Sequence, residues 1–264
     1  MRLPAAIAAL LLFPLTVAAE TTEVDVELFL AVDVSRSMSA VELEIQRRGY
    51  AAALVSDEVI SAVEGGLLGR IAITYVEWAG EGSQTVVVPW TVLASLEDAV
   101  GVANAITARF NNGMRRTSIS GALDYAARDI RENAYDGLRR VIDVSGDGPN
   151  NQGGPVLASR DAALAEGLVI NGLPLMTSDA FSEIWGIPDL DAYYRNCVIG
   201  GPGAFVIPVL NWDQFAEAVK RKLVLEIASV PPEAVPVQYR ADEPYDCLIG
   251  EKKWQENRRY FDIP

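Results

Sequence analysis

The feature that most limits the possible folds is the alternation of apolar runs with helical patterns along the chain. Runs such as "ELFLAVD" and "RIAITYVEW" are nearly continuous in apolar residues, as expected of strands buried on both faces of a sheet. Segments with helical spacing lie between them, and one begins at Ser39, which with Glu42 three residues later fits a capping box. The alternation predicts an α/β fold, doubly wound, with a mainly parallel central sheet and helices on both faces.

The expected elements divide the chain into one domain and two flanking segments. We expect strands at 24–33, 70–80, 138–148, 168–176 and 203–210, with a short antiparallel edge strand near 84–89. We expect helices from Ser39 to about Glu64 and at 95–110, 118–133, 154–167 and 211–229. No internal linker is apparent, so a single domain at 20–228 is predicted, preceded by 1–19 and followed by a C-terminal tail at 229–264 that packs on the domain.

The first 19 residues are typical of a secretory signal peptide. "MRLPAAIAALLLFPLTVAA" has one Arg, an apolar run and small residues before the expected cut. An uncleaved membrane anchor is the alternative, but the run is short for a membrane span and contains Pro14. After cleavage no stretch is long and apolar enough to cross a bilayer, so the mature chain is predicted to be periplasmic or secreted.

Export makes the two cysteines, Cys197 and Cys247, informative. Thiols pair in oxidising compartments, so these two are predicted to form a disulfide that clips the C-terminal tail to the domain. The alternative is a pair of buried free thiols.

Charge and composition argue against several classes of function. The chain has 36 acidic and 22 basic residues and a formal net charge of −14, which repels nucleic acids and anionic membranes unless a local basic patch intervenes. The arginine pairs are scattered and form no such patch, so no nucleic-acid partner is expected. It contains no His, so Ser-His-Asp and Cys-His catalysis are excluded.

Three hydrophilic clusters fall where loops meet helices at the carboxyl ends of predicted strands. "DVSRS" has Asp33, Ser35 and Ser37, "RRTSISGAL" has Thr117 before a helix, and "VSGDG" has Asp147 after a strand. Ligands bind at this edge of open α/β sheets. Two carboxylates and three hydroxyls form a hard oxygen set that suits Mg²⁺ better than Zn²⁺ or copper, with Mn²⁺ or Ca²⁺ as possible substitutes. Because hydroxyls are weak ligands, a partner's carboxylate could complete the site.

These residues resemble the metal-ion-dependent adhesion site of von Willebrand factor type A domains. That family has Asp-x-Ser-x-Ser after its first strand, a Thr before a later helix and an Asp after a central strand, and the resemblance spans about residues 24–228. It implies that Ser35, Ser37 and Thr117 contact the metal and that Asp33 and Asp147 act largely through waters.

The implied function is a non-enzymatic module that binds a protein partner presenting a carboxylate. The chain is also similar to an uncharacterised subgroup of exported bacterial proteins within this superfamily. It departs from the usual pattern at Arg115 and Arg116, which stand where small residues often precede the Thr, and at Gly146, where a Thr or Ser often precedes the Asp.

Two other interpretations stay open. "GDGPNN" at 146–151 is close to the Mg²⁺-binding motif of haloacid dehalogenase-like phosphatases. That family, however, places a general acid two residues after its nucleophilic Asp, and Ser35 holds that position here. The clusters could also be capping and turn residues of a metal-free scaffold.

Overall fold

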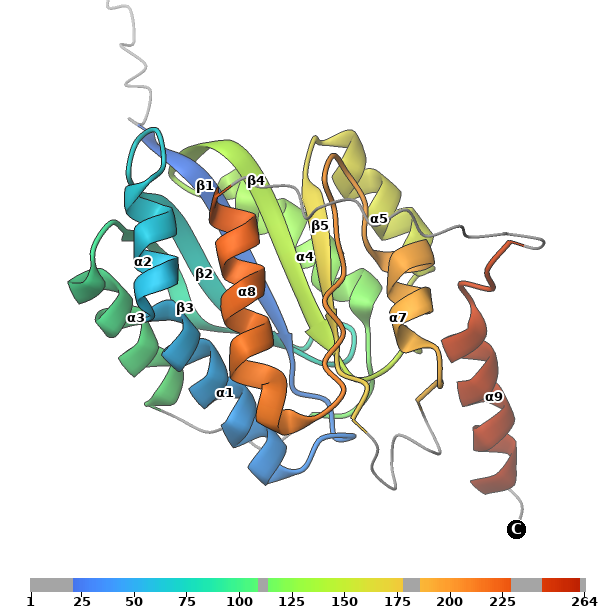
Figure 1. The fold of residues 1–264 in the computed structure, drawn as a ribbon. Helices are drawn as coiled ribbons and strands as arrows, with labels where there is room; N and C mark the ends of the chain where they lie inside the picture. Colours follow the sequence, from blue (N-terminus) through green and yellow to red (C-terminus); the bar gives the residue numbers. More distant parts are fainter. Residues whose placement is uncertain (1–20, 109–113, 178–185, 229–243, 262–264) are drawn as a thin grey trace, which may run out of the picture.

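The computed structural model describes residues 21–108, 114–177, 186–228 and 244–261 (Figure 1). The elements follow one another as β1 (Thr22–Asp33), α1 (Ala40–Leu54), α2 (Asp57–Glu64), β2 (Ile71–Trp78), β3 (Gln84–Leu93), α3 (Leu96–Thr107), α4 (Ile119–Glu132), β4 (Tyr135–Gly146), α5 (Val156–Ala165), β5 (Val169–Pro174), α7 (Leu190–Tyr193), the π-helix η1 (Tyr194–Val198), the 3-10 helix η2 (Trp212–Gln214), α8 (Phe215–Ala228) and α9 (Ile249–Phe261).

The sheet has five strands in the order β3-β2-β1-β4-β5. β1 pairs in parallel with β2 on one side and with β4 on the other, and β4 pairs in parallel with β5. β3 is antiparallel to β2 and lies at an edge. The predicted fold class is therefore confirmed, including the antiparallel edge strand near 84–89.

Helices cover both faces of the sheet, which explains the near-continuous apolar strands. Every residue of β1 from Val24 onward and every residue of β2 is buried. One core cluster contains side chains of α1, α2, α3 and α8, and a second contains side chains of α4, α5 and α7 (Figure 1). Successive residues of β1, such as Leu28 and Phe29, belong to different clusters. The central strand is thus held by two apolar layers.

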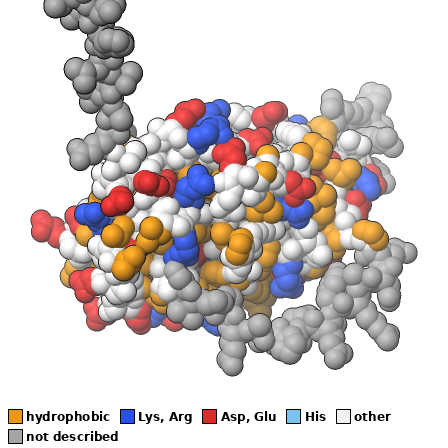
Figure 2. All heavy atoms as spheres, turned by 90° about the horizontal axis from the view of Figure 1, so that it is seen from above, with side chains coloured by type: hydrophobic (Ala, Val, Ile, Leu, Met, Phe, Trp, Pro, Cys, Tyr) orange, Lys and Arg blue, Asp and Glu red, His pale blue; other side chains and the backbone are white. Residues whose placement is uncertain are grey.

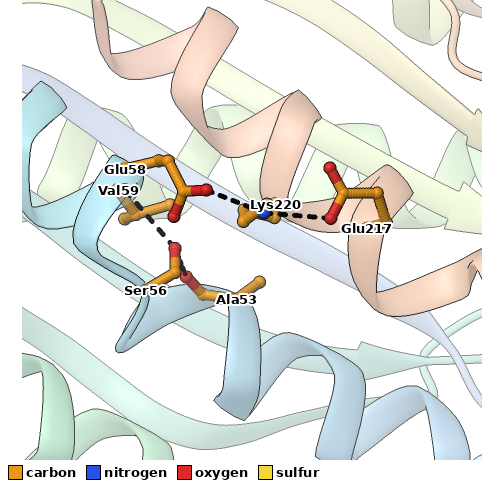
Figure 3. Close-up of polar contacts among 6 residues, drawn as sticks. All are labelled: Ala53, Ser56, Glu58, Val59, Glu217 and Lys220. Atoms are coloured by element: carbon orange, nitrogen blue, oxygen red, sulfur yellow. Dashed lines mark hydrogen bonds and ion pairs between the residues drawn. The ribbon is translucent and has the colours of Figure 1, made fainter.

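The single helix predicted from Ser39 to Glu64 is wrong, because two helices occupy this stretch. α1 ends at Leu54, and the hydroxyl of Ser56 donates to the carbonyl of Ala53 (2.7 Å) while accepting from the amide of Val59 (3.4 Å) (Figure 3). Ser56 is thereby the N-cap of α2. A serine that caps a new helix competes with continuation of the old one.

Lys220 links α2 to α8 beside this break. Its ammonium lies 2.9 Å from a carboxylate oxygen of Glu58 on α2 and 2.9 Å from one of Glu217 on α8 (Figure 3). Both carboxylates are largely exposed, so these ion pairs contribute little to stability.

The predicted strand at 203–210 does not form. Isolated bridges join Val206 to Gly172 of β5 and Val209 to Leu175, the residue after β5. The amides of Ile207 and Val209 donate to the carbonyls of Gly172 and Pro174 (3.0 and 2.9 Å). Pro174, at the end of β5, has no amide hydrogen to donate in return, so the ladder is interrupted there. The segment therefore runs beside the edge of the sheet without extending it as a regular strand.

The C-terminal tail contains a helix that the sequence analysis did not predict. α9 begins at Ile249, two residues after Cys247. Cys247 forms the predicted disulfide with Cys197, which is confirmed, with Cα atoms 5.5 Å apart and a sequence separation of 50. The predicted signal peptide at 1–19 lies outside the described residues, as does the first part of the tail at 229–243.

The amino-terminal ends of the parallel strands β1, β2, β4 and β5 lie at the end of the molecule that is seen from above in Figure 2. Acidic, basic and hydrophobic side chains are interspersed on this face. A cavity of about 450 Å³ opens here, lined among others by Asp25, Leu67, Leu138 and Arg139. In the part of the chain that the structure describes, no helix combines the length and apolar character required to span a bilayer.

Candidate functional site

The candidate site lies where the connections leave the sheet in opposite directions. β1 is followed by helices that pack on one face, whereas β4 is followed by α5 on the other face. Asp33 is the last residue of β1, and Asp147 follows the last residue of β4. The ends are neighbours, because Val32 pairs with Ser145 in the parallel ladder. This is the switch point at which open α/β sheets bind ligands.

Asp33 is fixed by its own loop and by α1. Its side chain is fully buried, and its Oδ1 accepts a hydrogen bond from the amide of Ser35 (2.7 Å). The side-chain amide of Gln46 on α1 donates to the carbonyl of Asp33 (2.8 Å). The other carboxylate oxygen, Oδ2, is buried and has no hydrogen-bond partner among the described residues. One acceptor at the strand end is thus left for a ligand.

Ser35, Ser37 and Asp147 form a continuous hydrogen-bonded group. The hydroxyls of Ser35 and Ser37 are 2.9 Å apart, and the Ser37 hydroxyl donates to Oδ1 of Asp147 (2.8 Å). The Ser35 hydroxyl makes a longer bond to the same oxygen (3.5 Å). Two loops separated by more than a hundred residues therefore meet through the side chains that the sequence singled out.

Thr117 is held against both of these loops through the backbone. Just before it, Met114 donates to the carbonyl of Val34 (2.9 Å) and accepts from the amide of Arg36 (2.7 Å). The amide of Thr117 donates to Oδ1 of Asn151 (3.0 Å), and its carbonyl accepts from the amide of Asn151 (2.9 Å). The buried Thr117 thus lies on a loop that joins the Asp33 segment to the Asp147 segment.

Ionisation of both carboxylates is unfavourable in the absence of a cation. Burial raises the pKa of the Asp33 carboxyl well above its usual range, and the charge of Asp147 raises it further, against the hydrogen bonds from Ser35. No group of three or more His, Cys, Asp or Glu that could hold a metal occurs in the described residues. The donor set is instead two carboxylates with serine and threonine hydroxyls, and the partnerless oxygen of Asp33 fits a hard divalent cation.

Gly146 is explained by the packing of the site. A Cβ at this position would lie 2.9 Å from Oδ2 of Asp33 and 2.9 Å from the phenolic oxygen of Tyr194. Tyr194 is buried, and its hydroxyl has no hydrogen-bond partner among the described residues. A Thr or Ser at position 146 would therefore collide with the carboxylate or displace it. The departure from the usual pattern keeps space open beside Asp33.

Sequence reasoning missed the role of the two asparagines after Asp147. Asn151 clamps Thr117, and Oδ1 of the buried Asn150 accepts from the amide of Ser120 at the start of α4 (3.0 Å). The consecutive amides in "DGPNN" were the available signal, because Asn side chains commonly hydrogen-bond to nearby backbone.

Several solved structures share this fold at low sequence identity. A von Willebrand factor type A protein from Catenulispora acidiphila has a TM-score of 0.52 and 15% identity, with 78% of this chain and 43% of that chain covered. The pilus adhesin SpaC from Lactobacillus rhamnosus GG has a TM-score of 0.56 and 12% identity, covering 77% and 31%. Proximal thread matrix protein 1 from the mussel byssus has a TM-score of 0.51 and 18% identity, covering 80% and 49%. The chain spans less than half the length of each.

No curated protein sequence matches the chain. The family described as "Protein of unknown function (DUF1194)" matches residues 23–231, from the start of β1 to just beyond α8. This match covers most of the chain and includes all five candidate site residues. The chain therefore belongs to the DUF1194 family, and its fold is that of a von Willebrand factor type A domain.

Proposed function

We propose that this chain is an exported, metal-dependent protein-binding module. In this proposal Ser35, Ser37, Thr117, Asp33 and Asp147 hold one divalent cation, Mg²⁺ in the first instance, and a carboxylate of a protein partner binds to it. The observation that carries the proposal is the convergence of the Ser35–Ser37–Asp147 group on Asp33, whose Oδ2 lacks a partner among the described residues.

The residues divide into two roles. The hydroxyls of Ser35, Ser37 and Thr117 contact the ion, and the carboxylates of Asp33 and Asp147 act largely through waters. Neutral hydroxyls leave the ion with unneutralised positive charge, so it supplies a local cation within a chain of formal net charge −14. An acidic group of the partner meets that charge, while the surrounding loops determine which partner is accepted.

Binding accounts for the site better than phosphoryl transfer does. Ser35 stands two residues after Asp33, and an alcohol is a poor general acid at neutral pH. The names of two proteins that share the fold, a pilus adhesin and a byssus matrix protein, agree with a binding or structural class. Purified protein is therefore expected to show no hydrolysis of p-nitrophenyl phosphate with Mg²⁺.

Export is part of the proposal. A signal peptide at 1–19 would deliver the domain at 20–228 and its tail at 229–264 to the periplasm or the medium. The Cys197–Cys247 disulfide supports this, because such bonds persist mainly in oxidising compartments. Amino-terminal sequencing of the secreted product should find the mature chain starting near Glu20.

Calorimetric titration of the purified protein with Mg²⁺ and Mn²⁺ tests the metal site. Wild type is expected to bind one ion, and Ser37→Ala and Asp33→Ala should weaken binding at least tenfold. Ser39→Ala is the matched control, because Ser39 lies two residues further on and caps α1 by accepting from the amide of Glu42 (3.3 Å). It should lower the free energy of unfolding by about 1 kcal/mol and leave metal binding unchanged.

The partner is tested by capture from extracellular or periplasmic extract. A bound protein should be released by EDTA, return with Mg²⁺ and be absent with Asp33→Ala. If folded Asp33→Ala and Ser37→Ala proteins bind metal as wild type does, the cluster only caps a loop. Mg²⁺-dependent phosphate hydrolysis that Asp33→Asn abolishes would replace the proposal with the phosphatase alternative.

A further inference from the structure

The C-terminal helix α9 lies beside the candidate metal site but outside the part of the chain that matches the family. The family match ends at residue 231, whereas α9 spans Ile249–Phe261. In Figure 1 this helix flanks α7 at the end of the molecule where β4 terminates. An added element at this position can act on the loops that carry the site.

The start of α9 is fixed to the domain by a covalent bond and by packing. Cys247 is bonded to Cys197, which is fully buried in η1. Next to it, the Tyr245 hydroxyl donates to Asp189 (2.9 Å), and its ring packs edge-on against Tyr193 at a centroid distance of 6.2 Å. The helix therefore begins from an anchored point.

The first turn of α9 contacts the loop that follows Asp147. Oε1 of Glu251 accepts from the side-chain amide of Asn150 (2.7 Å). Gly250 lies so close to this loop that a Cβ there would be 2.1 Å from the Asn150 carbonyl and 2.9 Å from Pro149. Since Asn150 also holds the amide of Ser120 (3.0 Å), α9 completes the hydrogen bonding of a residue that joins the loop to α4.

The second turn of α9 contacts the loop that precedes Thr117. The Arg116 guanidinium lies over the Trp254 ring, 4.0 Å from its centroid. Among the described residues Arg116 is the one non-glycine with a positive φ, 78°. Such a conformation is unfavourable and persists only where surrounding contacts enforce it. The stack on Trp254 is one contact that holds Arg116, and with it the adjacent Thr117, in position.

We propose that α9 is a positioning element of the metal site, acting on the Asp147 loop through Glu251 and on the Thr117 loop through Trp254. This inference rests on the proposed function. Neither residue touches the ion; both hold ligand-bearing loops in the arrangement that the ion requires. Groups that orient metal ligands typically change affinity about 10- to 100-fold when removed, so loss of either contact should weaken metal binding about tenfold.

The test compares folded, disulfide-bonded full-length variants. Trp254→Ala and Glu251→Ala remove one contact each. Trp254→Phe keeps a ring for Arg116 to stack on and should restore most of the affinity. Glu256→Ala is the matched control, because it makes the same change on an exposed part of the same helix. Calorimetry measures Mn²⁺ affinity, and urea unfolding checks that global stability is retained.

Hydrogen–deuterium exchange without metal gives a second readout that does not depend on the ion. Peptides covering 114–121 and 147–152 should exchange faster in Trp254→Ala and Glu251→Ala, and at the wild-type rate in Trp254→Phe and Glu256→Ala. Weakened Mn²⁺ binding together with faster exchange supports the inference. Unchanged exchange in both loops overturns it, as does wild-type Mn²⁺ affinity in both contact variants. If wild type binds no metal, the proposed function fails, and the exchange result alone decides whether α9 positions these loops.

Discussion

A buried ionic cluster between α8 and the sheet should make the stability of this protein depend on pH. Nζ of Lys222 on α8 lies 2.7 Å from Oδ1 of Asp143 on β4, an ion pair that is not aligned as a hydrogen bond, and it also pairs with Glu226. The side-chain amide of Asn171 donates to Oε1 of Glu226 (2.9 Å). One cation thus faces two buried carboxylates. Burial raises the pKa of Glu226 to about 7, and Asp143 raises it while Lys222 opposes the shift.

The magnitude of the effect follows from this pKa. In the folded state Glu226 keeps its proton up to about pH 7, whereas in the unfolded chain it ionises near its ordinary value of 4.5. Its contribution to stability is therefore present below about pH 4.5 and is lost as the pH rises through 7. The loss amounts to about 3 kcal/mol. Glu226→Gln keeps an acceptor for Lys222 and Asn171 but cannot ionise, so it should gain stability relative to wild type by about this amount between pH 4.5 and pH 8.

Urea unfolding at pH 5, 6, 7 and 8, at constant ionic strength and with EDTA present, measures the difference between the two proteins. Glu217→Gln is the control, since Glu217 is an exposed residue of the same helix, and its difference from wild type should stay nearly flat across this range. If the difference in unfolding free energy between wild type and Glu226→Gln is the same at pH 5 and pH 8, Glu226 is ionised throughout this range. Lys222 would then be enough to keep both buried carboxylates charged, and the prediction would be wrong.

Two further substitutions test the core and the site. Arg47→Met should lower the free energy of unfolding, measured by urea denaturation, by about 3–5 kcal/mol. The substitution leaves Glu77 buried without its hydrogen-bond donor, Nε of Arg47 (2.6 Å). Adding Glu77→Gln should recover much of the loss. Gly146→Ala should weaken Mn²⁺ binding, measured by calorimetry, at least tenfold, because its methyl group would lie 2.9 Å from the Asp33 carboxylate. Gly148→Ala is the control: its methyl group would have no neighbour within 4 Å, so it should bind Mn²⁺ as wild type does.

Long apolar runs allowed the sheet to be predicted because burial on both faces leaves a plain signal. β1 and β2 are buried almost throughout, and the short connection after β2 indicated an antiparallel neighbour. The predictions that were wrong lie where a local hydrogen-bonding preference opposes the hydrophobic pattern. Ser56 ends one helix and caps another within an apolar pattern. Pro174 at the end of β5 interrupts the ladder with the stretch at 203–210, which has strand-like composition. α9 is mostly polar, so no apolar stripe indicated a helix docked on the domain.

The candidate site could be predicted in part because its motifs follow strand ends. The sequence placed Asp33 and Asp147 at one edge of the sheet, and the structure joins Asp147 to Ser35 and Ser37 by hydrogen bonds. The supporting residues could not be found this way. Tyr194 reaches the site from a π-helix and is close only in three dimensions, so no spacing in the sequence indicates its contact.

The strand topology gives a reason to expect a cation at the carboxyl ends of β1 and β4. Because Val32 pairs in parallel with Ser145, the next residues along both strands are carried to the same place, and Asp33 and Asp147 come together there. Burial and mutual repulsion then raise the pKa of Asp33, a cost that a purely structural pair of turn residues would avoid with one Asn. Gly146 keeps the space beside the carboxylate open. A buried oxygen without a partner, a second carboxylate and a cleared space together favour a site built to bind a positive ion.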